Sequence, residues 1–178
     1  MRHPLEFVHV DHRKRFFITF LLLTLSLFAV FRVLDEPLQT DYAPNGIVSF
    51  ELAGTPQNAA HIVLTWPEQA GLSAAFGLGI DYLFMPVYAF ALAFGTLLAA
   101  GRHGGWFKSL GAVAGYGAFA AALFDAVENY ALFQILLGAF DSSYPILAAV
   151  CATVKFGLLA FGLLVAIVGG VIPRSVKA

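Results

Sequence analysis

The sequence predicts an all-α integral membrane protein built as a four-helix bundle. First, 60% of the 178 residues are hydrophobic and 12% are charged, whereas soluble domains carry about 25% charged residues. Second, the chain contains four apolar runs, each near or above the roughly 20 residues that a helix needs to cross a bilayer. Third, its Lys and Arg residues are concentrated on one of the two sides that such spans would define.

The predicted spans are residues 16–34, 77–100, 107–137 and 144–172 of one transmembrane domain, 1–178. A basic start followed by an apolar run is also typical of a signal peptide. Because no cleavage site with two small residues precedes Asp35, we expect an uncleaved first span. The third and fourth runs exceed the minimum length, which indicates tilt or extension beyond the hydrocarbon.

The distribution of basic residues predicts the topology. Basic residues occur in the N-terminal tail, in the loop after residue 100 and in the C-terminal tail, where they are Arg174 and Lys177. The segment 35–76 contains acidic residues and no Lys or Arg. The positive-inside rule therefore predicts cytoplasmic termini in a bacterial-type inner membrane. With a net charge of −1 and no basic groove, we expect no nucleic-acid partner.

The segment 35–76, which we call the lid, is predicted to lie outside the cytoplasm. We expect a turn at 45–46, a short extended piece at 47–52, and a helix that begins at Thr55-Pro56 and stops before Pro67. The apolar face of this helix consists of Ala59, Ile62, Val63 and Trp66. We interpret it as an amphipathic helix on the outer membrane surface; the alternative is a loop packed over the bundle. Either arrangement covers the outer ends of the spans.

Four ionisable residues lie inside the apolar runs: Asp81, Asp125, Glu128 and Lys155. Each costs roughly 2.5–3.5 kcal/mol at a helix centre, so such residues face the bundle interior, pair with one another or act in function. Helical spacing places three of them on faces that continue with small residues and so favour close packing. These faces are Asp81, Met85, Tyr88, Leu92, Gly95 and Ala99; Gly111, Gly115, Ala118, Ala122, Asp125 and Asn129; and Ala148, Ala152, Lys155, Leu159, Gly162, Ala166 and Gly169.

The depth of these residues predicts where a site would lie. At 1.5 Å per residue they fall roughly 6–18 Å below the outer boundary, in the outer half of the bilayer. The inner halves of the spans carry few polar residues. We therefore expect a polar pocket that opens toward the extracytoplasmic side or toward the outer leaflet.

Asp125, Glu128 and Asn129 occupy neighbouring positions on one helix, because residues three and four apart are adjacent. A carboxylic acid kept neutral beside an ionised one can act as a general acid–base pair, so Asp125, Glu128 and Lys155 are the predicted catalytic residues. The alternative is an ion pair of Lys155 with either acid, which would fix the helix register. The predicted ligand-binding residues are Asp81, Asn129, Tyr88, Arg32 and His61.

We expect no cofactor, although the oxygens of Asp81, Asp125 and Glu128 would suit a divalent cation such as Mg²⁺ or Ca²⁺. Lys155 competes for the same acids, and no span contains a histidine for zinc. The single cysteine, Cys151, excludes an internal disulfide and a CxxC pair.

Three classes of function fit these observations. The first is a protein that binds or processes a lipid-like or amphiphilic ligand, with membrane lipids as its partners. The second is a proton- or ion-coupled small transporter that acts as an oligomer. The third is a structural subunit whose buried charges form ion pairs, within the chain or with a partner membrane protein. The sequence leaves open whether the protein is an enzyme.

Overall fold

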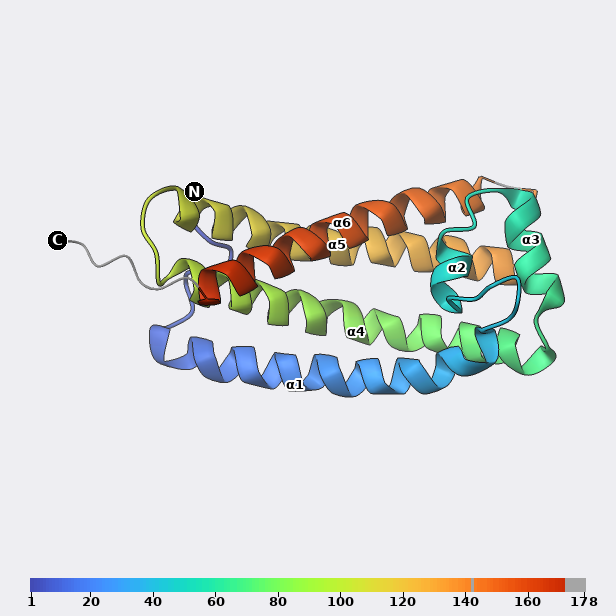
Figure 1. The fold of residues 1–178 in the computed structure, drawn as a ribbon, viewed down its shortest axis with the longest axis horizontal. Helices are drawn as coiled ribbons and strands as arrows, with labels where there is room; N and C mark the ends of the chain where they lie inside the picture. The colour runs from blue at the N-terminus through green and yellow to red at the C-terminus, as the bar shows by residue number, and fades with distance from the viewer. Residues whose placement is uncertain (142, 172–178) are drawn as a thin grey trace. The chain divides into compact units, whose positions relative to one another are not determined.

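The computed structural model describes residues 1–141 and 143–171, and every regular element in these ranges is a helix (Figure 1). The elements are α1 (Val10–Asp35), the short 3-10 helix η1 (Glu36–Leu38), α2 (Ile47–Glu51), α3 (Pro56–Thr65), α4 (Glu68–Ala100), α5 (Trp106–Leu136) and α6 (Tyr144–Val171). Helices α1, α4, α5 and α6 are long and apolar enough to cross a membrane. The predicted all-α fold with four candidate spans is confirmed.

Two of the four long helices, α1 and α4, extend well beyond the predicted spans at their N-terminal ends. Helix α5 differs from the predicted 107–137 by one residue at each end, and α6 begins at the predicted Tyr144. Helices α1 and α4 begin six and nine residues before the apolar runs. Hydropathy marks only the apolar part of a helix, whereas backbone hydrogen bonding continues into polar sequence. The end of the fourth run, Ile172, and the basic Arg174 and Lys177 lie outside the described residues.

The chain forms two compact units, and each of the four long helices contributes to both. Unit 1 comprises Met1–Leu25, Pro86–Ala122 and Lys155–Ala178, and unit 2 comprises Ser26–Met85 and Leu123–Val154. By sequence, unit 1 contains nine of the ten Lys and Arg residues, and unit 2 contains nine of the eleven Asp and Glu residues. The charges are therefore segregated between the units.

Unit 1 is held together by close helix contacts and by aromatic rings. A Cβ atom added at Gly162 would lie 2.7 Å from Leu92 Cδ2, so this glycine lets α6 approach α4 closely. The ring of Phe20 on α1 stacks on Phe90 of α4, with ring centroids 5.0 Å apart. Helix α1 itself has no buried residue. It is joined to unit 1 through ring contacts rather than through an inward seam of small residues.

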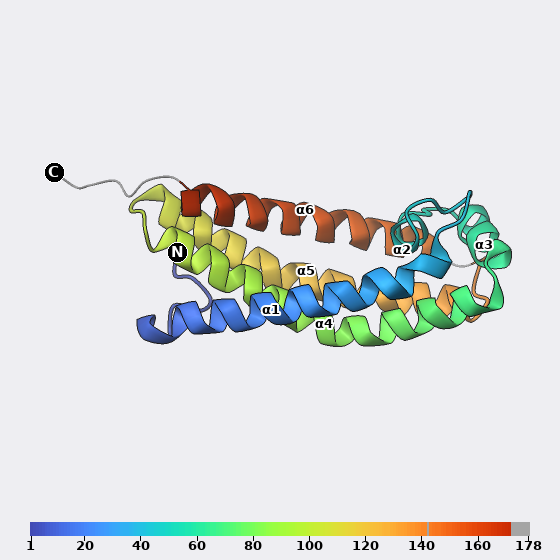
Figure 2. The same ribbon diagram turned by 60° about the horizontal axis from the view of Figure 1, so that its bottom comes forward.

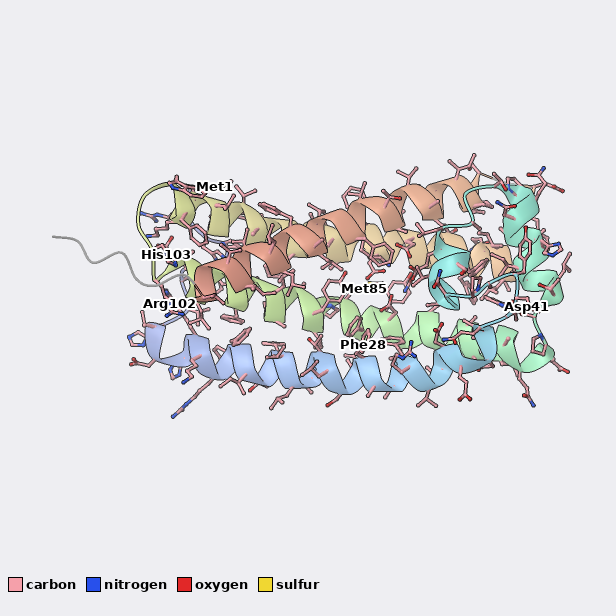
Figure 3. The ribbon with its side chains drawn as sticks, viewed as in Figure 1. Met1, Phe28, Asp41, Met85, Arg102 and His103 are labelled. Carbon is pink, nitrogen blue, oxygen red and sulfur yellow. The ribbon has the colours of Figure 1, made fainter. Side chains whose placement is uncertain are left out.

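The turn between α4 and α5 caps the C-terminal end of α6 within unit 1. Figure 3 shows Arg102 and His103 in this turn. Arg102 donates a hydrogen bond to the carbonyl of Gly170, and His103 Nε2 donates to the carbonyl of Gly169 at 2.9 Å. These donors satisfy carbonyls that a helix end leaves without intrahelical partners.

In unit 2 the lid packs on the ends of α4, α5 and α6 where these helices meet (Figure 2). The core here joins lid residues such as Leu38, Phe50 and Ile62 to Leu78 of α4 and Leu132 of α5. The predicted cap is confirmed, because the Thr55 side chain accepts a hydrogen bond from the Asn58 amide at 3.2 Å and Pro56 opens α3. Helix α3 ends at Thr65, before Pro67 as predicted.

One element of the lid was predicted incorrectly. Residues 47–51 form helix α2, not an extended piece. The cause lies outside the segment: Asp35 Oδ1 accepts a hydrogen bond from the Ile47 amide at 2.7 Å and so satisfies the N-terminal end of α2. The predicted turn at 45–46 is present, and Gly46 has a φ of 56° that favours glycine. A Cβ atom at Gly46 would also collide with the Asp35 carboxylate.

The apolar face of α3 is buried in protein. Ala59 and Ile62 are buried, and Trp66, the next residue after α3, donates from its indole nitrogen to the Leu38 carbonyl at 3.1 Å. Trp66 also packs edge-on against Phe50, with ring centroids 5.2 Å apart. These side chains are therefore not available to a membrane surface, and the packing matches the alternative prediction of a loop that covers the bundle.

Candidate functional site

The candidate site lies in unit 2 and centres on three polar residues of α5. Asp125, Glu128 and Asn129 are 3%, 0% and 1% exposed, although they lie in a helix apolar enough to cross a membrane. Their spacing of three and four residues puts them at adjacent positions on one side of the helix. The predicted small-residue face leads to them, since Gly111, Gly115 and Ala118 are also buried.

Asn129 connects this group to α4. Its amide nitrogen Nδ2 donates to Asp81 Oδ2 at 2.8 Å and to the Leu78 carbonyl at 3.3 Å. The Tyr82 hydroxyl donates in the other direction, to the Ala126 carbonyl of α5 at 3.2 Å. Buried polar groups require partners, so these bonds fix how α4 and α5 face each other in unit 2.

The sequence of α4 accounts for the position of Asp81. Ala70, Ala74 and Leu78 are buried and follow one another at four-residue intervals, and Asp81 comes three residues later on the same side. On α5 the fully buried Ala131 and Leu132 come two and three residues after Asn129. Along both helices, the polar residues are thus neighbours of an apolar core that α4, α5 and the lid form together.

Lys155 and Tyr88 are the other buried residues among those predicted for the site. Lys155 is buried, and its Nζ lies 4.7 Å from the centroid of the Phe156 ring. Tyr88 is buried on α4. Both residues belong to unit 1, whereas Asp81, Asp125, Glu128 and Asn129 belong to unit 2. Within unit 2 the structure joins Asp81 to Asn129 and gathers the three residues of α5.

Arg32 and His61 are both exposed residues of unit 2. The ring of His61 packs against that of Tyr42, with centroids 3.9 Å apart, and the Tyr42 hydroxyl donates to Asn58 Oδ1 at 3.4 Å. His61 is therefore part of a cluster on the exposed side of the lid.

A groove of about 370 Å³ also belongs to unit 2 and is lined by Gly54, Ile146, Ala149, Val150, Thr153 and Val154. The only polar side chain in this set is Thr153, and its hydroxyl donates to the Ala149 carbonyl at 2.7 Å. The groove therefore offers an apolar wall. Counted from the hairpin between α5 and α6 at equal rise per residue, Glu128 and Asn129 lie at the level of Cys151 and Ala152, close to Val150 and Thr153.

Three buried polar residues were not predicted: His3, Glu51 and Thr96. Thr96 could have been noticed as a polar residue inside the apolar run of α4. His3 precedes the first span, where no periodic pattern indicates burial, and Glu51 lies in the segment wrongly predicted to be extended.

The carboxylates of Asp125 and Glu128 are hydrogen-bond acceptors, and burial strengthens the bonds that such groups make. Among residues 1–141 and 143–171, no group of three or more His, Cys, Asp or Glu side chains is arranged to hold a metal ion. The divalent cation at Asp81, Asp125 and Glu128 stays a prediction. Comparison of the chain with protein-family models, with curated proteins and with solved structures gave no match.

Proposed function

We propose that this protein binds an amphiphilic, lipid-like ligand, whose polar group contacts Asp125, Glu128 and Asn129. The observation that carries the proposal is the burial of two carboxylates and an amide on one side of α5. A ligand with a cationic or hydrogen-bond-donating head group suits these residues, because carboxylate and amide oxygens accept hydrogen bonds and a carboxylate favours a nearby positive charge.

The apolar groove supports the amphiphilic character of the ligand. It belongs to the same unit as the buried acids and lies at the level of Glu128 and Asn129. An alkyl chain against Val150 and Val154 would remain in an apolar environment while the head group approaches the carboxylates. If the ligand is processed as well as bound, Asp125 and Glu128 are the proposed acid–base pair, and Lys155 is the third proposed catalytic residue.

We also propose that the protein lies in a bacterial-type inner membrane with cytoplasmic termini, so that the lid lies on the extracytoplasmic side. The distribution of basic residues supports this orientation. Eight of the ten Lys and Arg residues lie within residues 1–15, 102–108 and 174–177, which the positive-inside rule assigns to the cytoplasmic side. The ligand would then come from the outer leaflet or from the extracytoplasmic side.

The test is native mass spectrometry of the full chain released from lipid nanodiscs, with Asp125→Asn and Glu128→Gln as variants. Asp141→Asn is the matched control, because Asp141 is an exposed acid of the same unit. We expect the wild type and the control to retain a bound lipid or amphiphile. Both site variants should bind the copurified lipid about tenfold more weakly at an unchanged melting temperature, which corresponds to one lost charged hydrogen bond of about 1.5 kcal/mol.

A structural role is the second candidate, and the hydrogen bond from Asn129 to Asp81 favours it because it joins two helices. In that case Asp125→Asn and Glu128→Gln would lower the melting temperature and leave the copurified molecules unchanged. That outcome would refute the ligand-binding proposal. Ion-coupled transport remains a prediction from the sequence.

A further inference from the structure

The residues that precede α1 fold into unit 1. Leu5 is 4% exposed and packs among Ala93, Phe94, Leu97 and Ala118 of α4 and α5. Two turns shape the segment, since the Glu6 amide donates to the His3 carbonyl at 3.0 Å and the Val8 amide donates to the Leu5 carbonyl at 3.1 Å. Residues 1–8, here called the N-terminal segment, therefore dock on unit 1, with His3 and Leu5 as their buried residues.

The His3 ring is the innermost polar group of the segment, at 6% exposure. The Leu5 amide donates to His3 Nδ1 at 3.1 Å, so Nδ1 is an acceptor and the ring hydrogen is on Nε2. Nε2 lies 3.2 Å from Thr96 Oγ1, whose own hydroxyl donates to the Ala93 carbonyl at 3.0 Å. Both ring nitrogens are thus satisfied in one neutral tautomer. A proton on Nδ1 would remove the bond from Leu5.

Gly115 of α5 makes room for this ring. A Cβ atom at position 115 would collide with His3 Nε2, and Cε1 would lie only 2.8 Å away. Gly117, two residues further along the same helix, faces elsewhere: a Cβ atom there would meet only Leu158, at an ordinary 3.6 Å. The chain therefore provides one glycine that permits docking of His3 and a nearby glycine that does not contact it.

Charged groups hold the outer part of the segment. Arg13 donates from Nε to the Val8 carbonyl and from Nη2 to the Glu6 carbonyl, both at 2.8 Å. Lys108 Nζ lies 3.1 Å from Glu6 Oε1. His9 pairs with Asp11 at 3.3 Å, but both side chains are more than 70% exposed and do not pack against His3.

We propose that the N-terminal segment is a proton-operated latch, which is docked in unit 1 while His3 is neutral and is released when His3 binds a proton. Release would uncover the apolar contacts of Ala93, Leu97 and Ala118 and remove the segment from the interface of α4 and α5. This inference concerns unit 1 and is independent of the ligand proposed for unit 2.

The direction of the pH effect follows from burial. Desolvation lowers the pKa of His3 from 6.5 to about 4; the Glu6 carboxylate opposes this shift and Arg13 adds to it. A group whose pKa is depressed by docking favours docking fully above pH 6.5, and the benefit is lost as the pH falls from 6.5 toward 4. The hydrogen bond from Lys108 lowers the pKa of Glu6, so the pair of Glu6 and Lys108 persists over most of the range from pH 6.5 to 4.

The test is hydrogen exchange of the full chain in nanodiscs, measured by mass spectrometry on the peptide that covers residues 1–9 between pH 7.5 and 5. Protection factors remove the intrinsic pH dependence of exchange. Relative to pH 7.5, we expect protection to fall about tenfold at pH 5.5 and about thirtyfold at pH 5. Peptides of α3 should keep constant protection and serve as the internal control.

Three variants separate docking from proton binding. Gly115→Ala should abolish protection of the segment at every pH, whereas Gly117→Ala should behave as the wild type. His3→Gln removes the titrating group and should show no pH dependence, whatever its level of protection. A wild-type segment that is unprotected at pH 7.5, or protection that stays constant down to pH 5, would overturn the proposal. So would a His3→Gln variant that keeps the wild-type loss of protection.

Discussion

The hydrogen bond between Asn129 and Asp81 offers a quantitative check on how α4 and α5 pack in unit 2. Hydrogen bonds between membrane helices contribute about 0.6 kcal/mol on average and up to about 1.7 kcal/mol. This bond is 2.8 Å long, ends on a carboxyl oxygen and has a donor residue that is 1% exposed. These features place it toward the upper end, so we expect a coupling of about 1–1.7 kcal/mol.

The assay is a double-mutant cycle of Asp81→Ala, Asn129→Ala and the double variant, with the free energy of unfolding measured in mixed micelles of increasing SDS content. Asn129→Ala alone should cost more than the coupling, because it also removes the bond to the Leu78 carbonyl. A second cycle of Asn129 with the exposed Asp141 should give no coupling. If the first cycle gives less than about 0.3 kcal/mol, which is within the error of additivity, the two side chains do not interact and the reasoning fails.

Three further predictions concern packing, capping and topology. Gly162→Ala should lower the free energy of unfolding in the SDS titration by about 1–3 kcal/mol, because the added Cβ atom would lie 2.7 Å from a Leu92 methyl group. Gly157→Ala is the control. A Cβ atom at position 157 meets no atom within 4 Å, so this variant should be neutral or stabilising by up to about 1 kcal/mol. Thr55→Ala should cost the lid about 0.5–2 kcal/mol, seen as faster hydrogen exchange in α3 only; unchanged exchange would show that the cap does not stabilise it. An alkaline phosphatase fusion should be active after Asp41 and inactive after Gly104, and the reverse pattern would contradict the proposed orientation.

The parts of the fold that sequence predicted well are those set by helical periodicity. The alternation of small residues on α5 located Asp125 and Asn129 on a buried side, because a helix with one packed face repeats that face every three to four residues. The same logic placed Lys155 among buried residues of α6. Composition and run length were sufficient to identify four candidate spans.

The parts that sequence could not predict depend on contacts between distant segments. Helix α2 needs the Asp35 carboxylate at its N-terminal end, twelve residues before the amide it caps. The burial of His3 needs Thr96, 93 residues away, and the space left by Gly115. For α3 the pattern correctly gave an apolar face, but lipid and protein interior are equally apolar, so the pattern alone did not identify what the face contacts.

The absence of buried residues in α1 has a consequence for how its sequence can drift. In the proposed membrane placement the exposed side chains of α1 face lipid and are constrained mainly by their polarity, since hydrocarbon tails do not distinguish leucine from isoleucine, valine or phenylalanine. Most apolar positions of α1 should therefore accept exchanges among these residues. What matters for this helix is its overall apolar composition rather than which apolar residue stands at each position. The exceptions are the rings that stack on α4 in unit 1, such as Phe20, where a change of shape would be felt by a partner.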